Sequence, residues 1–195
     1  MKQERGRIGA LSHSRIYLLV LVAGMTLFAF FVFNSSVSVA DEKTKKRNNY
    51  PSFQTLVDAA KEGSTLIPPA GTYAGPVVVD KPLVIDGKNG VTIDAGGKGT
   101  VILLDTDGAT VQNLHLTNSG ESANDIDSGV QVRGNYNVIK DNVIDDCLFG
   151  VDLQQSKNNI VKRNTISSKD KFSLGQKGDS VRLWYSFNNK ITDNI

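Results

Sequence analysis

Short apolar runs at alternate positions, broken by Gly, Pro, Asp and Asn, dominate the chain from Thr65 onward. One such run recurs four times without gaps, beginning at Val111, Ile139, Val161 and Ile191. A second run, with two apolar residues at alternate positions, begins 9 or 10 residues before each copy. The upstream pairs are Val101 and Leu103, Val130 and Val132, Val151 and Leu153, and Val181 and Leu183. Alternation of this kind indicates strands with one buried face, so each coil of the chain is predicted to supply the same two strands.

The spacing of the copies indicates the architecture. They begin 28, 22 and 30 residues apart, which fits a coil of about 22 residues with two insertions. A parallel solenoid stacks each strand on its equivalent about 4.8 Å away and buries the same column in every coil, whereas an antiparallel sandwich predicts no such columns. We therefore predict an all-β fold, a right-handed parallel β-helix of the pectin-lyase-like type, over residues 65–195. The repeat does not close before Ile195, so we expect the β-helix to be truncated at this end.

The first 40 residues carry a different pattern. A basic start, an apolar run over residues 16–33 and the small-residue site Ser38-x-Ala40 predict that residues 1–40 are a signal peptide, cleaved after Ala40. The alternative is an uncleaved membrane anchor, because the apolar run approaches the length that spans a bilayer. In either case the rest of the chain is exported, and we expect a periplasmic location.

Two segments connect the signal to the β-helix. Residues 41–51 are mostly polar and charged, and they are predicted to form a linker. Residues 52–64 are predicted to form a short helix that caps the β-helix, with Ser52 as its N-cap and Gly63 as its stop. The apolar residues that share one face of this helix are Phe53, Leu56, Val57 and Ala60.

Asparagine recurs at one position of the repeat. Asn142, Asn164 and Asn194 occupy the column that Leu114 occupies in an earlier coil. Buried polar groups are expected to be hydrogen-bonded, and stacked side-chain amides can satisfy one another. We interpret the three as a structural ladder; the alternative is a ligand site.

The two insertions, residues 117–128 and 167–179, leave the coil after the same strand, so they are predicted to protrude from one edge. The uninserted coil between them turns at residues 145–149. Loops on a rigid scaffold often carry function, and our hypothesis is that this edge binds a partner; the alternative is a set of solvated turns. The candidate residues are Glu121, Asp125, Asp127, Asp145, Asp146, Asp170, Asp179, Arg182 and Trp184.

Charge and chemistry narrow the functional classes. Without residues 1–40 the chain has 18 cations and 19 acids, a balance that does not favour a nucleic-acid role. An inverting glycosidase needs a pair of carboxylates, and no predicted outward column supplies one. We interpret Asp152 beside Arg182 as a surface ion pair that contributes little to stability. Catalysis on polysaccharide would therefore have to come from the loop carboxylates alone, and we predict no turnover of acidic polysaccharide.

Metal binding has weak support in this sequence. His115 and the single cysteine, Cys147, are the weak candidates, since the only other histidine lies in the signal segment. One cysteine allows no internal disulfide, and a lone His and a lone Cys are more often structural. The metal ligands are thus undefined, and we expect no tightly bound cofactor, although copper or sulfur handling remains open.

Several segments resemble one family of repeat proteins. Residues 53–60, 69–76 and 81–87 are similar to the opening of NosD-type proteins within the carbohydrate-binding and sugar-hydrolase (CASH) repeats. The segments NDIDSGV at 124–130 and SLGQKGDSVRLWYSFNN at 173–189 resemble the NosD-type proteins more specifically. The resemblance covers residues 52–195 and corresponds to the N-terminal part of such a protein.

The resemblance implies a periplasmic accessory protein, not an enzyme, that assembles the copper-sulfide centre of nitrous oxide reductase. Its implied partners are an ABC-type ATPase and permease complex, a copper chaperone and the reductase, with membrane association through these partners. The resemblance transfers no metal-ligand motif to this sequence. The alternative function is a β-helix protein that binds or cleaves polysaccharide.

Overall fold

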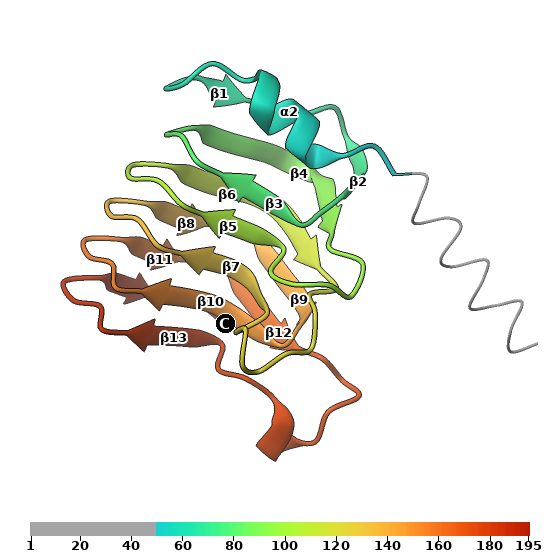
Figure 1. The fold of residues 1–195 in the computed structure, drawn as a ribbon, viewed down its shortest axis with the longest axis vertical. Coiled ribbons are helices and arrows are strands. Elements are labelled where there is room, and N and C mark those ends of the chain that lie inside the picture. Colours follow the sequence, from blue (N-terminus) through green and yellow to red (C-terminus); the bar gives the residue numbers. More distant parts are fainter. Residues whose placement is uncertain (1–49) are drawn as a thin grey trace, which may run out of the picture. The chain divides into compact units, whose positions relative to one another are not determined.

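The computed structural model describes residues 50–195, which form a parallel β-helix preceded by one short helix (Figure 1). The expected signal peptide and nearly all of the expected linker lie outside the described residues. The helix, α2 (Phe53–Ala59), buries Phe53 and Val57 completely, and the Phe53 ring packs edge-to-face on Tyr73 at 5.4 Å. No helix within residues 50–195 is long and apolar enough to cross a membrane.

Two sheets run along the solenoid, and all their strand pairs are parallel. The first contains β1 (Thr65–Leu66), β2 (Gly71–Ala74), β4 (Val84–Asp94), β6 (Thr110–Thr117), β8 (Val138–Lys140), β9 (Val143–Cys147), β11 (Ile160–Lys162), β12 (Thr165–Ser168) and β14 (Lys190–Thr192). The second contains β3 (Val77–Val79), β5 (Ile102–Leu104), β7 (Ser128–Val132), β10 (Phe149–Gln154) and β13 (Val181–Trp184). Each coil therefore alternates between the two sheets, and the fold is the predicted all-β parallel β-helix.

The register of the first sheet confirms the repeat alignment. Val111 pairs with Ile139, Ile139 with Val161, and Val161 with Ile191. The first three of these side chains are completely buried, whereas Ile191 is partly exposed on the last coil. Ile85 extends the same column by one coil in the other direction. One apolar column thus runs through five successive coils of the core.

The register of the second sheet corrects the prediction in one coil. Ile102 and Leu104, rather than Val101 and Leu103, pair with Val130 and Val132. Leu103 therefore faces outward. The prediction was wrong by one residue because residues 101–104 are all apolar, so the run has no alternation that fixes which side chains face the core.

Two glycines allow the sheets to approach each other inside the coil. A Cβ on Gly129 would lie 2.2 Å from Ile144 Cγ2. A Cβ on Gly150 would lie 2.2 Å from Ser180 O of the next coil and 2.4 Å from Ile166 Cγ2. Both glycines lie within strands, β7 and β10, and close packing inside the coil and against the next coil requires glycine here.

The expected asparagine column forms a ladder of amides at one corner of the coil. Asn142 Oδ1 accepts from Leu114 N at 3.1 Å, and Asn164 Oδ1 accepts from Asn142 N at 3.1 Å and Asn142 Nδ2 at 3.0 Å. Asn194 Oδ1 accepts from Asn164 in the same way. Each amide also donates to a backbone carbonyl of an adjacent coil, Val111 O in the case of Asn142. The corner is therefore satisfied without water.

A second ladder at the opposite end of the same strands was not predicted. Asn137, Asn159 and Asn189 are connected by the same pattern of bonds, beginning with Ala109 N, which donates to Asn137 Oδ1 at 2.7 Å. These residues recur at the same intervals, 22 and 30, as the first ladder, so spacing alone could have found them. Every ladder asparagine follows a residue with positive φ, which shows that both corners use a left-handed turn.

Asp86 is a buried carboxylate at the start of the first ladder corner. Burial opposes its ionisation, but hydrogen bonds from Lys88 and Asn113 outweigh that effect and hold the pKa of Asp86 far below its ordinary value. The Asp86 carboxylate therefore accepts hydrogen bonds from Lys88 in its own coil and from Asn113 in the next coil.

Candidate functional site

The two insertions lie on either side of the uninserted turn, as the sequence predicts. Phe149 N donates to Asp127 O of the first insertion at 3.1 Å, and Gly178 N of the second donates to Leu148 O at 3.0 Å. An ion pair between Glu121 and Lys171 joins the two insertions directly. We call this surface, residues 117–128, 145–149 and 167–179, the loop edge.

A groove of about 480 Å³ lies between the insertions. Leu148 and Phe149 of the short turn line it from the coil side, and residues of both insertions line its flanks, including Glu121, Phe172 and Asp179. Gly178 packs closely on the Phe149 ring, because a Cβ at this position would lie 2.4 Å from the ring and would require it to move. Sequence reasoning identified the acidic residues of this region but not its apolar lining, which exists only because two distant insertions meet.

The first insertion is ordered by Asp127, which corrects one site prediction. Asp127 is buried rather than exposed, and its Oδ2 accepts from Ser122 N at 2.8 Å. Gly120 packs against the same carboxylate so closely that a Cβ would lie 2.1 Å from Oδ2. Asp127 therefore folds the loop and is not available to a partner. Asp125, in contrast, is exposed and contacts only Ser122.

Beneath the second insertion lies a buried cation. The side chain of Lys169 is 2% exposed, and its Nζ lies 3.5 Å from Asp146 Oδ1, which is half exposed. At the outer end of the loop edge, the hydrogen bond from Lys171 holds the pKa of Glu121 below its ordinary value. These pairs fix the second insertion to the coil and to the first insertion.

Beside the groove, on the outer face of the first sheet, polar side chains gather around His115. Its Nε2 lies 2.9 Å from Asp145 Oδ1, but the ring N–H is not aligned with that oxygen, so the contact is not a good hydrogen bond. Thr92 Oγ1 lies 3.3 Å from the other ring nitrogen. A hollow of about 370 Å³ adjoins this cluster, lined by Asp145, Asp146, Ser167, Ser168, Asp170 and Lys171.

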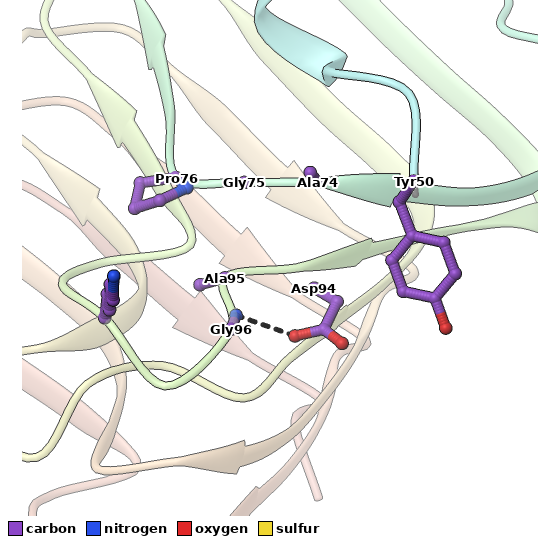
Figure 2. A pocket seen from close by; sticks show the side chains of 8 residues that line it. Tyr50, Ala74, Gly75, Pro76, Asp94, Ala95 and Gly96 are labelled. Atoms are coloured by element: carbon purple, nitrogen blue, oxygen red, sulfur yellow. Dashed lines mark hydrogen bonds between the residues drawn. The ribbon is translucent and has the colours of Figure 1, made fainter. Parts of the chain in front are cut away.

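One outward column of the first sheet contradicts the prediction that no such column pairs two carboxylates. Asp94 pairs with Thr117, and Thr117 pairs with Asp145, so two carboxylates share one column two coils apart. Two coil rises are about 10 Å, near the upper limit for an inverting pair. Asp94 Oδ1 already accepts from Gly96 N at 2.7 Å and Asn118 Nδ2 at 2.8 Å. Its carboxylate is thus engaged in the turn, as Figure 2 shows for Gly96.

A third hollow, of about 350 Å³, lies at the first coil where the chain passes from the first sheet to the second (Figure 2). It is lined by the Tyr50 ring, Asp94 and Lys98, together with the backbone around Gly75 and Pro76. The three hollows therefore all lie along the side of the β-helix that carries the insertions.

The two weak metal candidates are separated by the sheet. His115 lies on the outer face, whereas Cys147 is buried inside the coil, with its Sγ 3.9 Å from Leu116 O. Burial raises the pKa of the Cys147 thiol to about 12, so it is protonated at neutral pH and is a poor ligand. Within residues 50–195, no group of three or more His, Cys, Asp or Glu side chains is arranged to hold a metal ion.

Arg182 and Trp184 lie outside the groove, on the outer face of the second sheet. Arg182 donates to Asp152 Oδ1 at 2.8 Å, and Gln131 Nε2 lies 3.4 Å from Asp152 Oδ2. Asp152 is completely buried, so the expectation of a surface ion pair of little value was wrong. Loss of the partner of a buried charge costs about 3–5 kcal/mol, and this pair is therefore structural.

Comparison with known proteins fits this architecture. Residues 85–195 match the family described as "Right handed beta helix region", and the chain belongs to this family of right-handed β-helix proteins. It is also similar to the "Probable ABC transporter binding protein NosD" of Pseudomonas aeruginosa, with 30% identity over 117 residues. That alignment covers 59% of this chain and 27% of the relative. The chain is thus a right-handed β-helix protein, part of which is similar to NosD. No solved structure matches it.

Proposed function

We propose that this chain is an exported accessory protein that works with an ABC-type membrane complex to assemble the copper-sulfide centre of nitrous oxide reductase. The observation that carries the proposal is the similarity to a protein named as an ABC transporter binding protein. The segments at 124–130 and 173–189, which resemble NosD-type proteins most specifically, overlap the two insertions at residues 124–128 and 173–179. The resemblance therefore includes parts of the chain that depart from a bare β-helix.

The loop edge is the surface that we assign to partner binding. Two exposed acids, Glu121 and Asp179, line its groove, and Asp125 is exposed on the first insertion. Ion pairs and backbone hydrogen bonds hold the insertions in place, so a partner would meet a preorganised surface and lose little entropy in ordering it. We propose that copper or sulfur is cargo passed between the partners, and that this chain binds no resident cofactor.

Charge reversal at the loop edge tests this assignment. Asp125→Lys with Asp179→Lys changes two exposed acids and leaves the buried Asp127 intact. We expect an unchanged thermal midpoint and reduced co-purification with the ABC complex, the copper chaperone or the reductase. Asp80→Lys with Asp105→Lys makes the same change of net charge at exposed turns away from the insertions. If the first variant folds and co-purifies like the control, the loop edge does not bind these partners.

A cellular experiment tests the wider role. Cells that lack this protein should produce a reductase without the visible absorption and the copper content of its copper-sulfide centre, and the wild-type gene should restore both.

The polysaccharide alternative rests on the shared column of Asp94 and Asp145. Purified protein should release no reducing ends and no unsaturated uronides from acidic polysaccharides. Robust turnover that is abolished by Asp94→Asn or Asp145→Asn would reverse the assignment.

A further inference from the structure

Charge is segregated between two edges of the same coils. The loop edge carries seven acids and three cations. In the last three coils, the turns that lead from the second sheet to the first, with the strands that follow them, carry six cations and two acids over residues 133–141, 155–163 and 185–193. We call these three segments the basic edge. The two earlier turns on this side carry three acids, Asp80, Asp105 and Asp107, and one cation, Lys81. The chain carries almost no net charge after residue 40, but its negative and positive side chains are concentrated on different edges of the last three coils.

The basic edge is one continuous surface. Lys140 pairs with Lys162 in adjacent strands, and Lys157 forms a bridge with Phe187 in the next coil. Tyr136 N donates to Lys157 O at 3.2 Å, which connects the turn before it. In Figure 1 these turns lie on the left of the β-helix, whereas the second insertion leaves it at the bottom right.

Exposed aromatic rings accompany these cations. Tyr136, Tyr185 and Phe187 are 59%, 77% and 58% exposed, and Trp184, which precedes the third turn, is 49% exposed. Lys157 Nζ lies 5.9 Å from the centre of the Phe187 ring. Arg182, below Trp184, lies 4.9 Å from its indole ring. Each ring near the last coil thus has a cation or another ring beside it.

Tyrosine and tryptophan rings, which are apolar with one polar group, match the chemistry of the interface between water and an anionic bilayer when they lie next to Lys and Arg. Aromatic rings enter the headgroup region while the cations contact lipid phosphates. The edge consists of turns that project from the coil, which suits a flat surface, and the three hollows described above lie along the other edge.

We propose that the basic edge binds directly to an anionic phospholipid surface, with Trp184, Tyr185 and Phe187 entering the headgroup region. The negative loop edge would then be repelled by the same surface and would face the soluble partners. The lipid contact does not rest on the proposed role in reductase assembly. A failure of one therefore leaves the other standing.

Trp184 directly precedes the third segment of the basic edge and is the only tryptophan in the sequence, so its fluorescence reports on the surroundings of this edge. The processed protein is mixed with vesicles of phosphatidylcholine alone or with added phosphatidylglycerol. We expect a blue shift of the emission, and quenching by lipids brominated near the headgroup, only when phosphatidylglycerol is present. High salt should weaken the binding. The absence of a shift and of quenching with anionic vesicles would overturn the proposal.

Two pairs of variants separate specific binding from general electrostatics. Each basic residue near an anionic surface strengthens binding about fivefold, so Lys157→Glu with Lys190→Glu should weaken vesicle binding at least about tenfold. Lys61→Glu with Lys98→Glu makes the same charge change at exposed sites outside the basic edge, and it should have little effect. Equal losses in both pairs would refute a defined edge.

The aromatic part of the proposal has its own test. Tyr185→Ser with Phe187→Ser should reduce vesicle binding while the dependence on salt is kept, because the cations remain. A soluble acidic polysaccharide, such as alginate, is the competing ligand for an edge of this composition. If alginate produces the Trp184 shift and anionic vesicles do not, the basic edge is a glycan site and the lipid proposal is wrong.

Discussion

Replacement of Asn142 by leucine should destabilise the β-helix, even though leucine occupies the same column one coil earlier. The Asn142 amide accepts from Leu114 N at 3.1 Å and donates to Val111 O at 3.1 Å and Asn164 Oδ1 at 3.0 Å. The Asn142→Leu substitution leaves the backbone N–H of Leu114 without this acceptor and the carbonyl of Val111 without this donor. Each buried group left unsatisfied costs about 1–3 kcal/mol.

The gain from burying the apolar leucine side chain is smaller than this loss in a site already filled by an amide of similar size. Together the two effects predict that Asn142→Leu lowers the free energy of unfolding by about 2–4 kcal/mol. Urea unfolding followed by far-UV circular dichroism measures this change. Asn124→Leu, at an exposed position of the first insertion, is the matched control and should change stability by less than about 0.5 kcal/mol. A stability of Asn142→Leu within that same small margin would refute the view that the ladder holds the coils together.

Three further outcomes follow from the buried groups. Ile139→Asp places a charge in the central apolar column and should cost several kcal/mol in urea unfolding, whereas Val143→Asp, on the outer face, should cost far less. The Cys147 thiol, buried with a pKa of about 12, should not react with Ellman's reagent until urea unfolds the chain; rapid labelling of folded protein would contradict its placement. Asp86 has a lowered pKa in the fold, so its contribution to stability is present above pH 3.8, its ordinary pKa, and is lost as the pH falls below that value. Asp86→Asn should therefore be less stable than wild type at neutral pH and lose less stability on acidification; parallel pH profiles would contradict this.

The sequence by itself determined the architecture, because a solenoid repeats one pattern of burial in every coil. The column through Ile139 and the three-residue ladder from Asn142 could both be predicted, since each depends on residue identity at a fixed spacing. The same spacing contained the second ladder from Asn137, which we did not predict. The position of the two insertions on one edge also followed from the repeat, because equivalent strands must stack.

Only the tertiary structure decided what depends on contacts between distant coils. The run at residues 101–104 is apolar throughout, so pairing with the neighbouring strand, and not the sequence pattern, determined which side chains face inward. Asp127 and Asp152 look like ordinary surface acids in the sequence, but folding surrounds one with its own loop and the other with partners from adjacent coils. The groove and the basic edge arise in the same way, because residues from separate turns form one surface only after the chain has coiled. Spacing along the chain predicts which residues stack. The burial and the local charge of residues at the edges depend instead on the side chains of the neighbouring coils that lie next to them.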